Sequence, residues 1–364
     1  MKKRVIMTLA IVFLVGSGFH LLTSLEKIEI TREFGNQGQY IDDLAVGNCV
    51  TMRERNSLSS FPHIFGSRLY LYDIDNDKQS LLASTYIPFS EISHDVIVTK
   101  DAIYYHVPIW NEVIGDYYRR TDWKTQKIDI DTLYYGYSIY KNNIYYENVD
   151  NSSGEYLEAG SDLCTDIYVK NLDTGEEKKF LEGNFDYFRV KEDKMYCHDL
   201  KKKEILLVDV NNGKLLERYP YDGEYISFIE FGENDKFYIN EWKDIPEETP
   251  MGGIAEYDTN KKCTTWSMEC TGIEHNSRLH YKDGYLYYSS EFEIIRINVN
   301  NHKPEKLINL EPYMNPEEER GFITPSTVSY CDDYIVVDLS YFAEGEGYGD
   351  LLIYDYEGNY IRKE

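Results

Sequence analysis

Carboxylates are the most abundant groups in this chain that could do chemistry, with 64 Asp and Glu against 38 Lys and Arg in 364 residues. Two carboxylates held together could act as general acid and base, and several could hold a cation. The segment DIDNDK, from Asp73, begins like a calcium-binding loop. Its sixth residue is Lys78 where that loop needs glycine, and its twelfth is Ser84 where it needs glutamate. We therefore predict a hairpin turn at this segment and no metal site in the chain.

Other residue patterns of catalysis are missing from the sequence. It contains no G-x-S-x-G segment for a nucleophilic serine, no H-E-x-x-H segment for zinc and no Gly-Lys loop for phosphate. The eight histidines are dispersed. His275 and His280 stand five residues apart, which does not match two ligands one helical turn apart. We predict no catalytic residue and no cofactor.

The charge balance limits the partners that the chain can have. The formal net charge is −26, and the first 25 residues contribute three cations, Lys2, Lys3 and Arg4, and no acid. All the acidic side chains therefore lie in the remainder. Such a surface repels a phosphate backbone, so we expect no nucleic-acid partner. It keeps an exposed protein in solution, and it would attract cations or basic partners.

The N-terminus carries a targeting signal. The cations of MKKR precede residues 5–25, which have no formal charge and are long enough to cross a bilayer, since about 20 apolar residues suffice. Cations before such a segment favour a cytoplasmic N-terminus. We expect residues 1–25 to be a membrane anchor or signal peptide, 26–40 a linker and 41–364 the folded domain. The protein would then sit in the cell membrane, single-pass with its C-terminal domain outside the cytoplasm, or be secreted if the segment is cleaved.

The six cysteines do not form a disulfide framework by their spacing. Cys263 and Cys270 are the closest pair, but CTTWSMEC alternates like a strand, with Trp266 and Cys270 on one face and Cys263 on the other. Seven extended residues would separate the two Cα atoms by roughly 23 Å, beyond the reach of a bridge. Cys197 stands where a buried apolar residue belongs. We interpret most of the six as small buried hydrophobic residues.

Two repeated markers organise the rest of the chain. The first is an apolar residue just after a polar turn, at Ile103, Ile144, Met195, Phe237, Leu286 and Ile335, with a weaker copy at Val50. The second is an Asp- or Asn-rich turn, beginning at Asp73, Asp122, Asn171, Asp209, Glu256, Asn298 and Asp355. These residue types tolerate the left-handed backbone of tight hairpins. Each repeat thus predicts four short strands, A to D, with one turn joining A to B and another joining C to D.

Four strands repeated seven times indicate an all-β protein, a seven-bladed β-propeller of four-stranded antiparallel blades preceded by one N-terminal transmembrane or signal helix. Each blade of a propeller lies between two neighbours, so both faces are buried and the alternation of apolar and polar residues blurs, as in LYLYDI and EIIRIN. Tyrosine dominates, with 35 residues against 15 Phe, because it fills space while its hydroxyl reaches a polar partner. A β-sandwich and a parallel β-helix remain as alternatives.

The tyrosine-rich strands and Asp-initiated turns resemble the bacterial extracytoplasmic β-propeller domains of unknown function that are related in architecture to the low-density-lipoprotein-receptor type. The resemblance covers about residues 40 to 364. It implies the propeller fold and an extracytoplasmic location. The Tyr-Trp-Thr-Asp motif of the receptor propellers is absent, so receptor-like ligand binding does not carry over.

Long connections mark the expected working face. The A-to-B and C-to-D turns are short, whereas long B-to-C loops are predicted at 55–67, 108–118, 148–164, 243–253 and 342–349. Binding residues gather on long loops held by a rigid scaffold. Our tentative partner-binding residues are Trp110, Tyr117, Tyr118, Trp242, Glu344 and Glu346.

Two classes of function follow from this organisation. The first is a non-enzymatic binding module whose B-to-C loop face recognises a protein, peptide or glycan. The alternative is a propeller hydrolase or lyase acting on an extracellular polymer with loop-face carboxylates as acid and base. Those carboxylates would lie on different blades, so the sequence does not pair them.

Overall fold

A computed structural model describes residues 39–40, 47–53, 68–84, 96–98, 102–109, 111–120, 125–128, 137–147, 165–191, 193–223, 225–243, 251–270, 278–290, 292–313, 322–343 and 346–363. The predicted anchor, residues 1–25, lies outside these ranges. Of the described residues, none belongs to a helix that is long and apolar enough to cross a membrane.

The described chain is all-β, with one turn of 3-10 helix (η2, Glu311–Tyr313), and it divides into two compact units. Unit 1 holds residues 1–42 and 48–130. Its strands are β1 (Gln39–Tyr40), β2 (Cys49–Arg53), β3 (Arg68–Asp73), β4 (Lys78–Ser84), β5 (Val96–Val98), β6 (Ile103–Ile109), β7 (Asn111–Arg120) and β8 (Thr125–Ile128). They form two antiparallel sheets of orders β2-β3-β4 and β1-β5-β6-β7-β8.

Unit 2 holds residues 43–47 and 131–364. Its strands are β9 (Tyr137–Tyr140), β10 (Asn143–Glu147), β11 (Thr165–Asn171), β12 (Glu177–Lys191), β13 (Lys194–Asp199), β14 (Glu204–Asp209), β15 (Leu215–Pro220), β16 (Tyr225–Phe231), β17 (Lys236–Lys243), β18 (Met251–Asp258), β19 (Cys263–Cys270), β20 (His280–Lys282), β21 (Tyr285–Ser290), β22 (Glu293–Asn298), β23 (Lys303–Asn309), β24 (Phe322–Tyr330), β25 (Tyr334–Ala343), β26 (Glu346–Asp355) and β27 (Tyr360–Lys363). They form one antiparallel sheet running from β9 to β15 and three four-stranded antiparallel sheets.

Strand β12 belongs to two repeats at once. Its first part pairs with β11 as far as Phe185, and from Phe185 onward it pairs with β13. Gly183 lies at the changeover, where a Cβ atom would stand 2.5 Å from the Phe185 ring. The sheet from β9 to β15 is therefore two four-stranded meanders that share β12, the first ending on it and the second starting from it.

The Asp- and Asn-rich turns explain why the hairpins recur. In each described C-to-D turn the last residue of strand C accepts a backbone N–H from within the turn; the capping residues are Asp73, Asn171, Asp209, Asp258, Asn298 and Asp355. Each of these turns also contains one residue with positive φ, namely Asp77, Gly175, Gly213, Lys262, His302 or Gly358. Turns are confirmed at these six places, but the Asp or Asn acts as the cap, and the left-handed residue is a glycine, lysine or histidine in five of the six. In the turn that was predicted to begin at Glu256 the cap is Asp258, two residues later than expected. The turn after Asp122 lies outside the described residues.

The two kinds of short turn are tied together at one end of each sheet. The residue after strand C donates its backbone N–H to a carbonyl of the A-to-B turn, as in Leu172 to Asn142 at 2.8 Å and Thr259 to Asp235 at 2.9 Å. We call this end of a sheet the turn end. The opposite end, where B-to-C and D-to-A connections lie, we call the loop end.

Successive sheets of unit 2 pack face to face through apolar clusters. One cluster joins Ile205 and Tyr219 of the β12–β15 meander to Ile239 and Tyr257 of the next sheet. The following clusters join β16–β19 to β20–β23, and β20–β23 to β24–β27. Both faces of the sheets β16–β19 and β20–β23 are thus covered, as the blurred alternation predicted. Tyr145, Leu286 and Ile353, which lie on three different sheets, are all buried.

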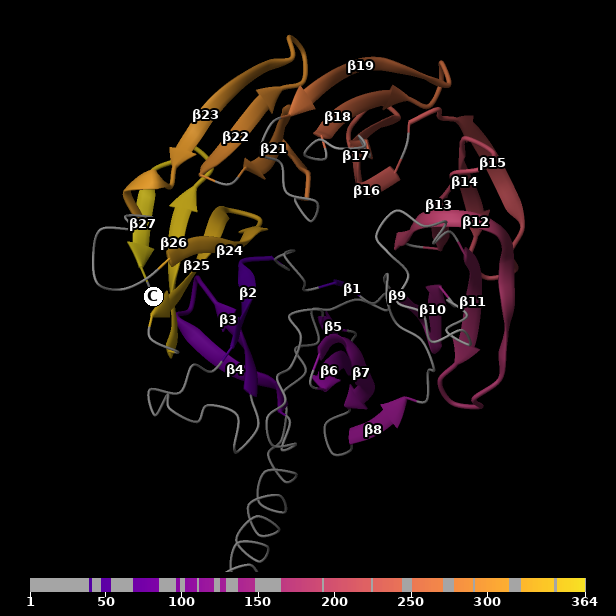
Figure 1. The fold of residues 1–364 in the computed structure, drawn as a ribbon, viewed down its shortest axis with the longest axis horizontal. Helices are drawn as coiled ribbons and strands as arrows, with labels where there is room; N and C mark the ends of the chain where they lie inside the picture. The colour runs from indigo at the N-terminus through magenta and orange to yellow at the C-terminus, as the bar shows by residue number, and fades with distance from the viewer. Residues whose placement is uncertain are drawn as a thin grey trace, which may run out of the picture. The chain divides into compact units, whose positions relative to one another are not determined.

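The first strands of the meanders neighbour one another. β12 lies against β16, and β16 against β20, while the fourth strands β15, β19 and β23 run along the outer side of the arc that this unit describes (Figure 1). The sheets therefore fan outward from their first strands. This arrangement places side chains of three different sheets close together along the inner side.

The cysteines behave largely as predicted. Cys197, Cys270 and Cys331 are buried and Cys263 is exposed, and none of the described cysteines is in a disulfide. Burial raises the pKa of the Cys270 thiol to about 11, so it is a protonated, inert group at neutral pH.

Candidate functional site

The structure corrects the predicted loop at 108–118. Strands β6 and β7 pair along most of this segment, with Pro108 opposite Gly115 and Ile109 opposite Asn111. A register shift beside Pro108 accommodates the proline, which we had interpreted as the start of a loop. Tyr117 and Tyr118 are therefore strand residues of β7.

Tyr118 is half-buried, and its ring stacks on that of Tyr105 with centroids 5.5 Å apart. This contact gives Tyr118 a packing role on the sheet. Trp110, between β6 and β7, lies outside the described residues. The binding role of these aromatic residues stays a prediction.

The other predicted binding residues belong to unit 2. Trp242 is a half-buried residue of β17, opposite Tyr225 and Gly252. Glu346 begins β26 opposite Ala343, and Glu344 lies outside the described residues. Strand pairing thus continues into the predicted loops 243–253 and 342–349, and these B-to-C connections are extended hairpins.

A buried polar cluster lies at the loop end, where sequence analysis placed no site. His198 of β13 is fully buried, and its Nδ1 lies 2.7 Å from Oδ1 of Asp186 on β12. The other Asp186 oxygen accepts the backbone N–H of Ile226 on β16 at 3.1 Å. The carboxylate thereby fixes the imidazole and connects two sheets. Nε2 of His198 has no hydrogen-bond partner among the described residues.

Two more carboxylates belong to this loop-end cluster. Glu147, the last residue of β10, is buried, and burial followed by the charge of Asp186 raises its pKa well above the ordinary range. One of its oxygens, Oε1, has no partner within the described part of the chain. Glu241 of β17 accepts a 2.5 Å hydrogen bond from the hydroxyl of Tyr221, whose ring meets the edge of His198.

This cluster has the parts of an acid–base site. An Asp-oriented imidazole could take a proton at Nε2, and a carboxyl group of raised pKa could give one. Weak signals of it are present in the sequence, since Glu147 and His198 interrupt the otherwise apolar strands IYYE and MYCHD. The distance between them along the chain hid their association.

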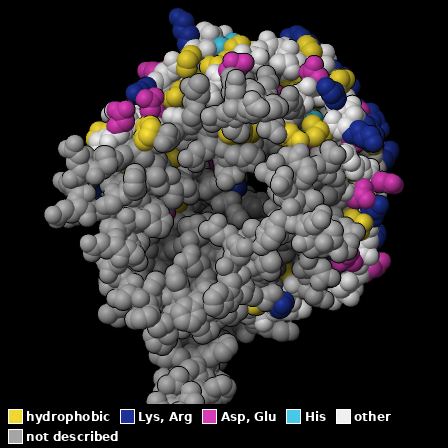
Figure 2. All heavy atoms as spheres, viewed as in Figure 1, with side chains coloured by type: hydrophobic (Ala, Val, Ile, Leu, Met, Phe, Trp, Pro, Cys, Tyr) yellow, Lys and Arg dark blue, Asp and Glu magenta, His cyan; other side chains and the backbone are white. Residues whose placement is uncertain are grey.

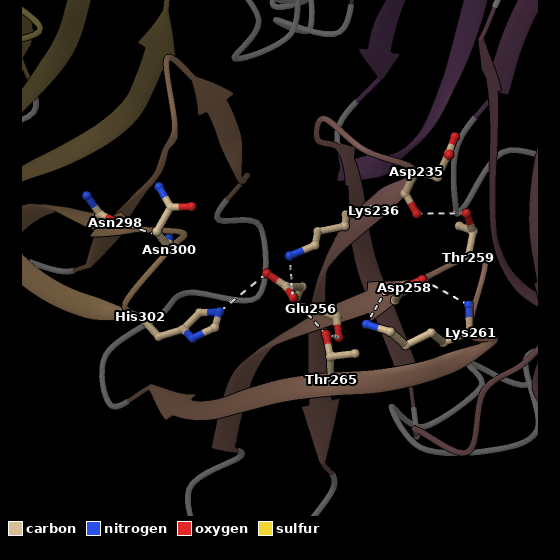
Figure 3. A network of polar contacts seen from close by, with 10 residues as sticks. All are labelled: Asp235, Lys236, Glu256, Asp258, Thr259, Lys261, Thr265, Asn298, Asn300 and His302. Atoms are coloured by element: carbon tan, nitrogen blue, oxygen red, sulfur yellow. Dashed lines mark hydrogen bonds and ion pairs between the residues drawn. The ribbon is translucent and has the colours of Figure 1, made fainter.

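A second polar network, at the turn end, is a structural joint (Figure 3). Glu256 of β18 is 2 % exposed and accepts hydrogen bonds from Lys236 at 2.8 Å and Thr265 at 2.7 Å, and its other oxygen lies 3.3 Å from Nε2 of His302. Burial would raise the pKa of Glu256, but these hydrogen bonds outweigh it and lower the pKa. His302 also stacks on Trp266, with ring centroids 4.5 Å apart. Every group has its partner, so the network joins two sheets and is left with little capacity to bind.

The described surface of unit 2 mixes both signs of charge. Lys and Arg side chains lie beside Asp and Glu side chains along its upper and right-hand edge (Figure 2). Pairs such as Lys262 with Glu217, at 2.7 Å, account for part of this mixing. Exposed pairs of this kind contribute little to stability.

Comparison with known proteins assigns no family. No protein-family model matches the chain, and no curated protein matches it. A computationally designed protein, Ika8, is similar at 12% identity, with 93% of this chain and 89% of Ika8 covered and a TM-score of 0.49. Sqt1 of Saccharomyces cerevisiae has 9% identity, coverage of 80% and 79% and a TM-score of 0.43. Dihydro-heme d1 dehydrogenase NirN, in complex with DHE, has 13% identity, coverage of 82% and 63% and a TM-score of 0.45. Such low similarity transfers no activity or ligand to this chain.

Proposed function

We propose that the chain forms one seven-bladed β-propeller, held at the membrane or secreted, that acts outside the cytoplasm as a non-enzymatic binding module. Seven copies of the C-to-D turn in the sequence, and the face-to-face packing of successive sheets in unit 2, support the count of seven blades. The ligand is a protein, peptide or glycan at the loop end.

The difference between the two ends of the sheets carries this proposal. At the turn end, the polar groups of the turns form hydrogen bonds with capping side chains and with the backbone of the neighbouring turn. At the loop end, the strands continue as long hairpins, with β25 and β26 each ten residues long. Phe292, in the β21–β22 turn at the same end, is 38 % exposed. Aromatic side chains on rigid hairpins are typical anchors of binding surfaces.

Substitution at the two ends tests the binding proposal. Partners would be captured from the extracellular fraction with the purified full-length chain and then measured as purified components. Phe292→Ala and Trp242→Ala should weaken binding at least tenfold, whereas Asn300→Ala at the turn end should leave it unchanged. Binding that survives both loop-end substitutions and is lost in Asn300→Ala, with all variants folded, would place the site at the wrong end.

The membrane location is a separate part of the proposal. The three cations before residues 5–25 support an orientation with the folded domain outside the cytoplasm. Protease added to intact cells should then degrade the domain. Protection that disappears only on lysis would refute this topology.

The loop-end cluster of Glu147, Asp186 and His198 supports a second candidate, a hydrolase or lyase acting on an extracellular polymer. The raised pKa of Glu147 suits a general acid. If the chain is an enzyme of this kind, it should release reducing ends from a polysaccharide, and Glu147→Gln should abolish the release. A folded wild-type chain that cleaves no acidic or neutral polysaccharide would leave the binding module as the function.

A further inference from the structure

Three carboxylates lie around His198 at the loop end and have no basic side chain as a partner. Oδ1 of Asp186 lies 2.7 Å from Nδ1 of His198. The ring of Tyr221 is T-shaped with that of His198, with centroids 5.6 Å apart, and its hydroxyl donates to Glu241 at 2.5 Å. Burial, and then the charge of nearby Asp186, raises the pKa of Glu147. Within the described part of the chain, none of these three carboxylates is paired with Lys or Arg.

Other buried carboxylates of unit 2 do have a cation beside them. Asp199 is paired with Lys202, and Glu256 with Lys236 at 2.8 Å. Carboxylates held close together away from water repel each other strongly, because the effective dielectric constant is low. Around His198 the repulsion is relieved by a proton on Glu147, whose pKa is raised well above its ordinary range. A cation that a ligand brings can take the place of that proton.

Two buried side chains of this cluster hold polar atoms without a hydrogen-bond partner. Glu147 is 4 % exposed and His198 is 0 % exposed, and among the described residues Oε1 of Glu147 and Nε2 of His198 have no partner. The Asp186 carboxylate only accepts hydrogen bonds, so Nδ1 of His198 carries the proton. Nε2 of the neutral imidazole is then an acceptor, as is Oε1 of an ionised Glu147. Buried acceptors without a donor cost stability, so a ligand that supplies donors would be held firmly.

Acidic side chains continue from these buried atoms toward the solvent. Glu241 is half-buried and Asp222 is exposed. Burial, and then the charges of Glu241, Asp222 and Asp186, raise the pKa of Tyr221, so all three carboxylates are near its hydroxyl. A series of like charges of this kind attracts a cation from solution.

The acceptors suit an ammonium group better than a metal ion or a guanidinium. The described residues include no group of three or more His, Cys, Asp or Glu side chains that could hold a metal ion. A guanidinium binds best to both oxygens of one carboxylate, but the two oxygens of Asp186 already face His198 and the backbone N–H of Ile226. An ammonium has three donors, which can serve acceptors on separate side chains.

A lysine side chain is the form of ammonium that suits buried acceptors. Its ammonium stands at the end of a flexible, unbranched stem of four carbon atoms, whereas the amine of an amino sugar stands directly on a ring. The stem needs only a narrow path to reach Glu147 and His198. A lysine-bearing partner would also be attracted by a chain of net charge −26.

We propose that Glu147, His198 and Glu241 bind the ammonium group of a lysine side chain that a protein or peptide partner inserts at the loop end, with Asp186 as the positioning residue for His198. The inference rests on the binding function proposed above, which places the ligand at this end, and it names the group that the ligand presents.

Calorimetric titration of the full-length chain in a mild detergent, at pH 7 and constant ionic strength, tests the proposal. The probes are Nα-acetyl-lysine methylamide, the same compound acetylated on its side-chain nitrogen, and glucosamine. We expect saturable binding of the first probe alone, weakened about tenfold or more in Glu147→Gln and in Glu241→Gln. Equal binding of the acetylated probe would overturn the ammonium assignment, and equal binding of glucosamine would overturn the choice of lysine.

Glu217→Gln is the matched control. Glu217 on β15 is paired with Lys262 at 2.7 Å, and its side chain is 43% exposed. Its substitution removes the same charge and should leave binding unchanged. The proposal fails if the lysine probe does not bind, or if Glu217→Gln weakens binding as much as Glu147→Gln. If circular dichroism shows that Glu147→Gln is unfolded, Glu241→Gln decides the outcome by the same criteria.

The binding module can stand when the ammonium site fails. A captured partner whose binding is weakened by Phe292→Ala, together with no binding of the lysine probe, would remove this site and retain the loop end as the binding surface. Binding of the lysine probe that Phe292→Ala and Glu217→Gln leave unchanged, and that Glu147→Gln weakens, would support the site on its own.

Discussion

Truncation of Leu286 tests whether the sheets are held together by the apolar clusters between them. Leu286 is 1 % exposed and belongs to the cluster that joins β16–β19 to β20–β23, with Phe228 and Tyr238 from the neighbouring sheet. Leu286→Ala removes three carbon atoms. At about 0.8 kcal/mol for each buried methylene-sized group the transfer cost alone is about 2.4 kcal/mol. The cavity between two sheets adds to it, so we expect a total of roughly 2–5 kcal/mol.

Leu216→Ala is the control with the same chemical change. Leu216 lies on β15 and is 46 % exposed, so its truncation should change the free energy of unfolding by about 0.5 kcal/mol or less. Urea denaturation, followed by tyrosine and tryptophan fluorescence at one fixed pH, measures both variants. The reasoning is refuted if Leu286→Ala costs no more than Leu216→Ala, because the buried residue would then contribute nothing to inter-sheet packing.

Three further predictions concern ionisable groups. Burial, and then the charge of Asp186, raises the pKa of Glu147 in the folded protein, and this costs stability as the pH rises above about 4.5. Glu147→Gln should therefore stabilise the protein at pH 7. An equal gain at pH 4 would contradict this. Burial lowers the pKa of His280 to about 4, so the unfolded chain binds the proton first and stability should fall by up to about 3 kcal/mol between pH 6.5 and 4. His280→Gln should remove that part of the pH dependence in urea denaturation, and an unaltered slope would argue against it. Asp209 has its pKa lowered by hydrogen bonds from Asn211, so Asp209→Ala should lower the Tm at pH 7 and have a smaller effect at pH 3; a Tm loss that is the same at both pH values would disprove the capping role.

Local chemistry made the turns predictable, whereas tertiary pairing hid the polar clusters. The types and spacing of Asp209 and Gly213 predict a capped turn, because the cap and the residue with left-handed backbone lie within five positions of each other. The error of two residues at Glu256 has the same origin, since the segment EYD offers two acids and only Asp258 caps. The association of Asp186 with His198 depends on which strands pair, and no local pattern encodes it.

The misread segments have physical reasons as well. Pro108 and Gly115 are residues that normally interrupt strands, yet they face each other across β6 and β7 at a register shift. Gly183 is likewise a residue that weakens strands, and β12 passes through it without ending. The repeated turns predicted the class of fold because each one marks a hairpin through its own residue types. They could not show where one sheet continues into the next.

The shared strand β12 also makes two repeats inseparable. A repeat protein commonly gains or loses whole units, since each one closes its own sheet and meets its neighbours only through side chains. β12 instead carries backbone hydrogen bonds to β11 along its first part and to β13 along its second. Removing either repeat would leave the other with an unpaired edge, so the two must be inherited, folded and lost as a single block. Within this chain, residues 177–191 are therefore a point at which the repeat number is fixed.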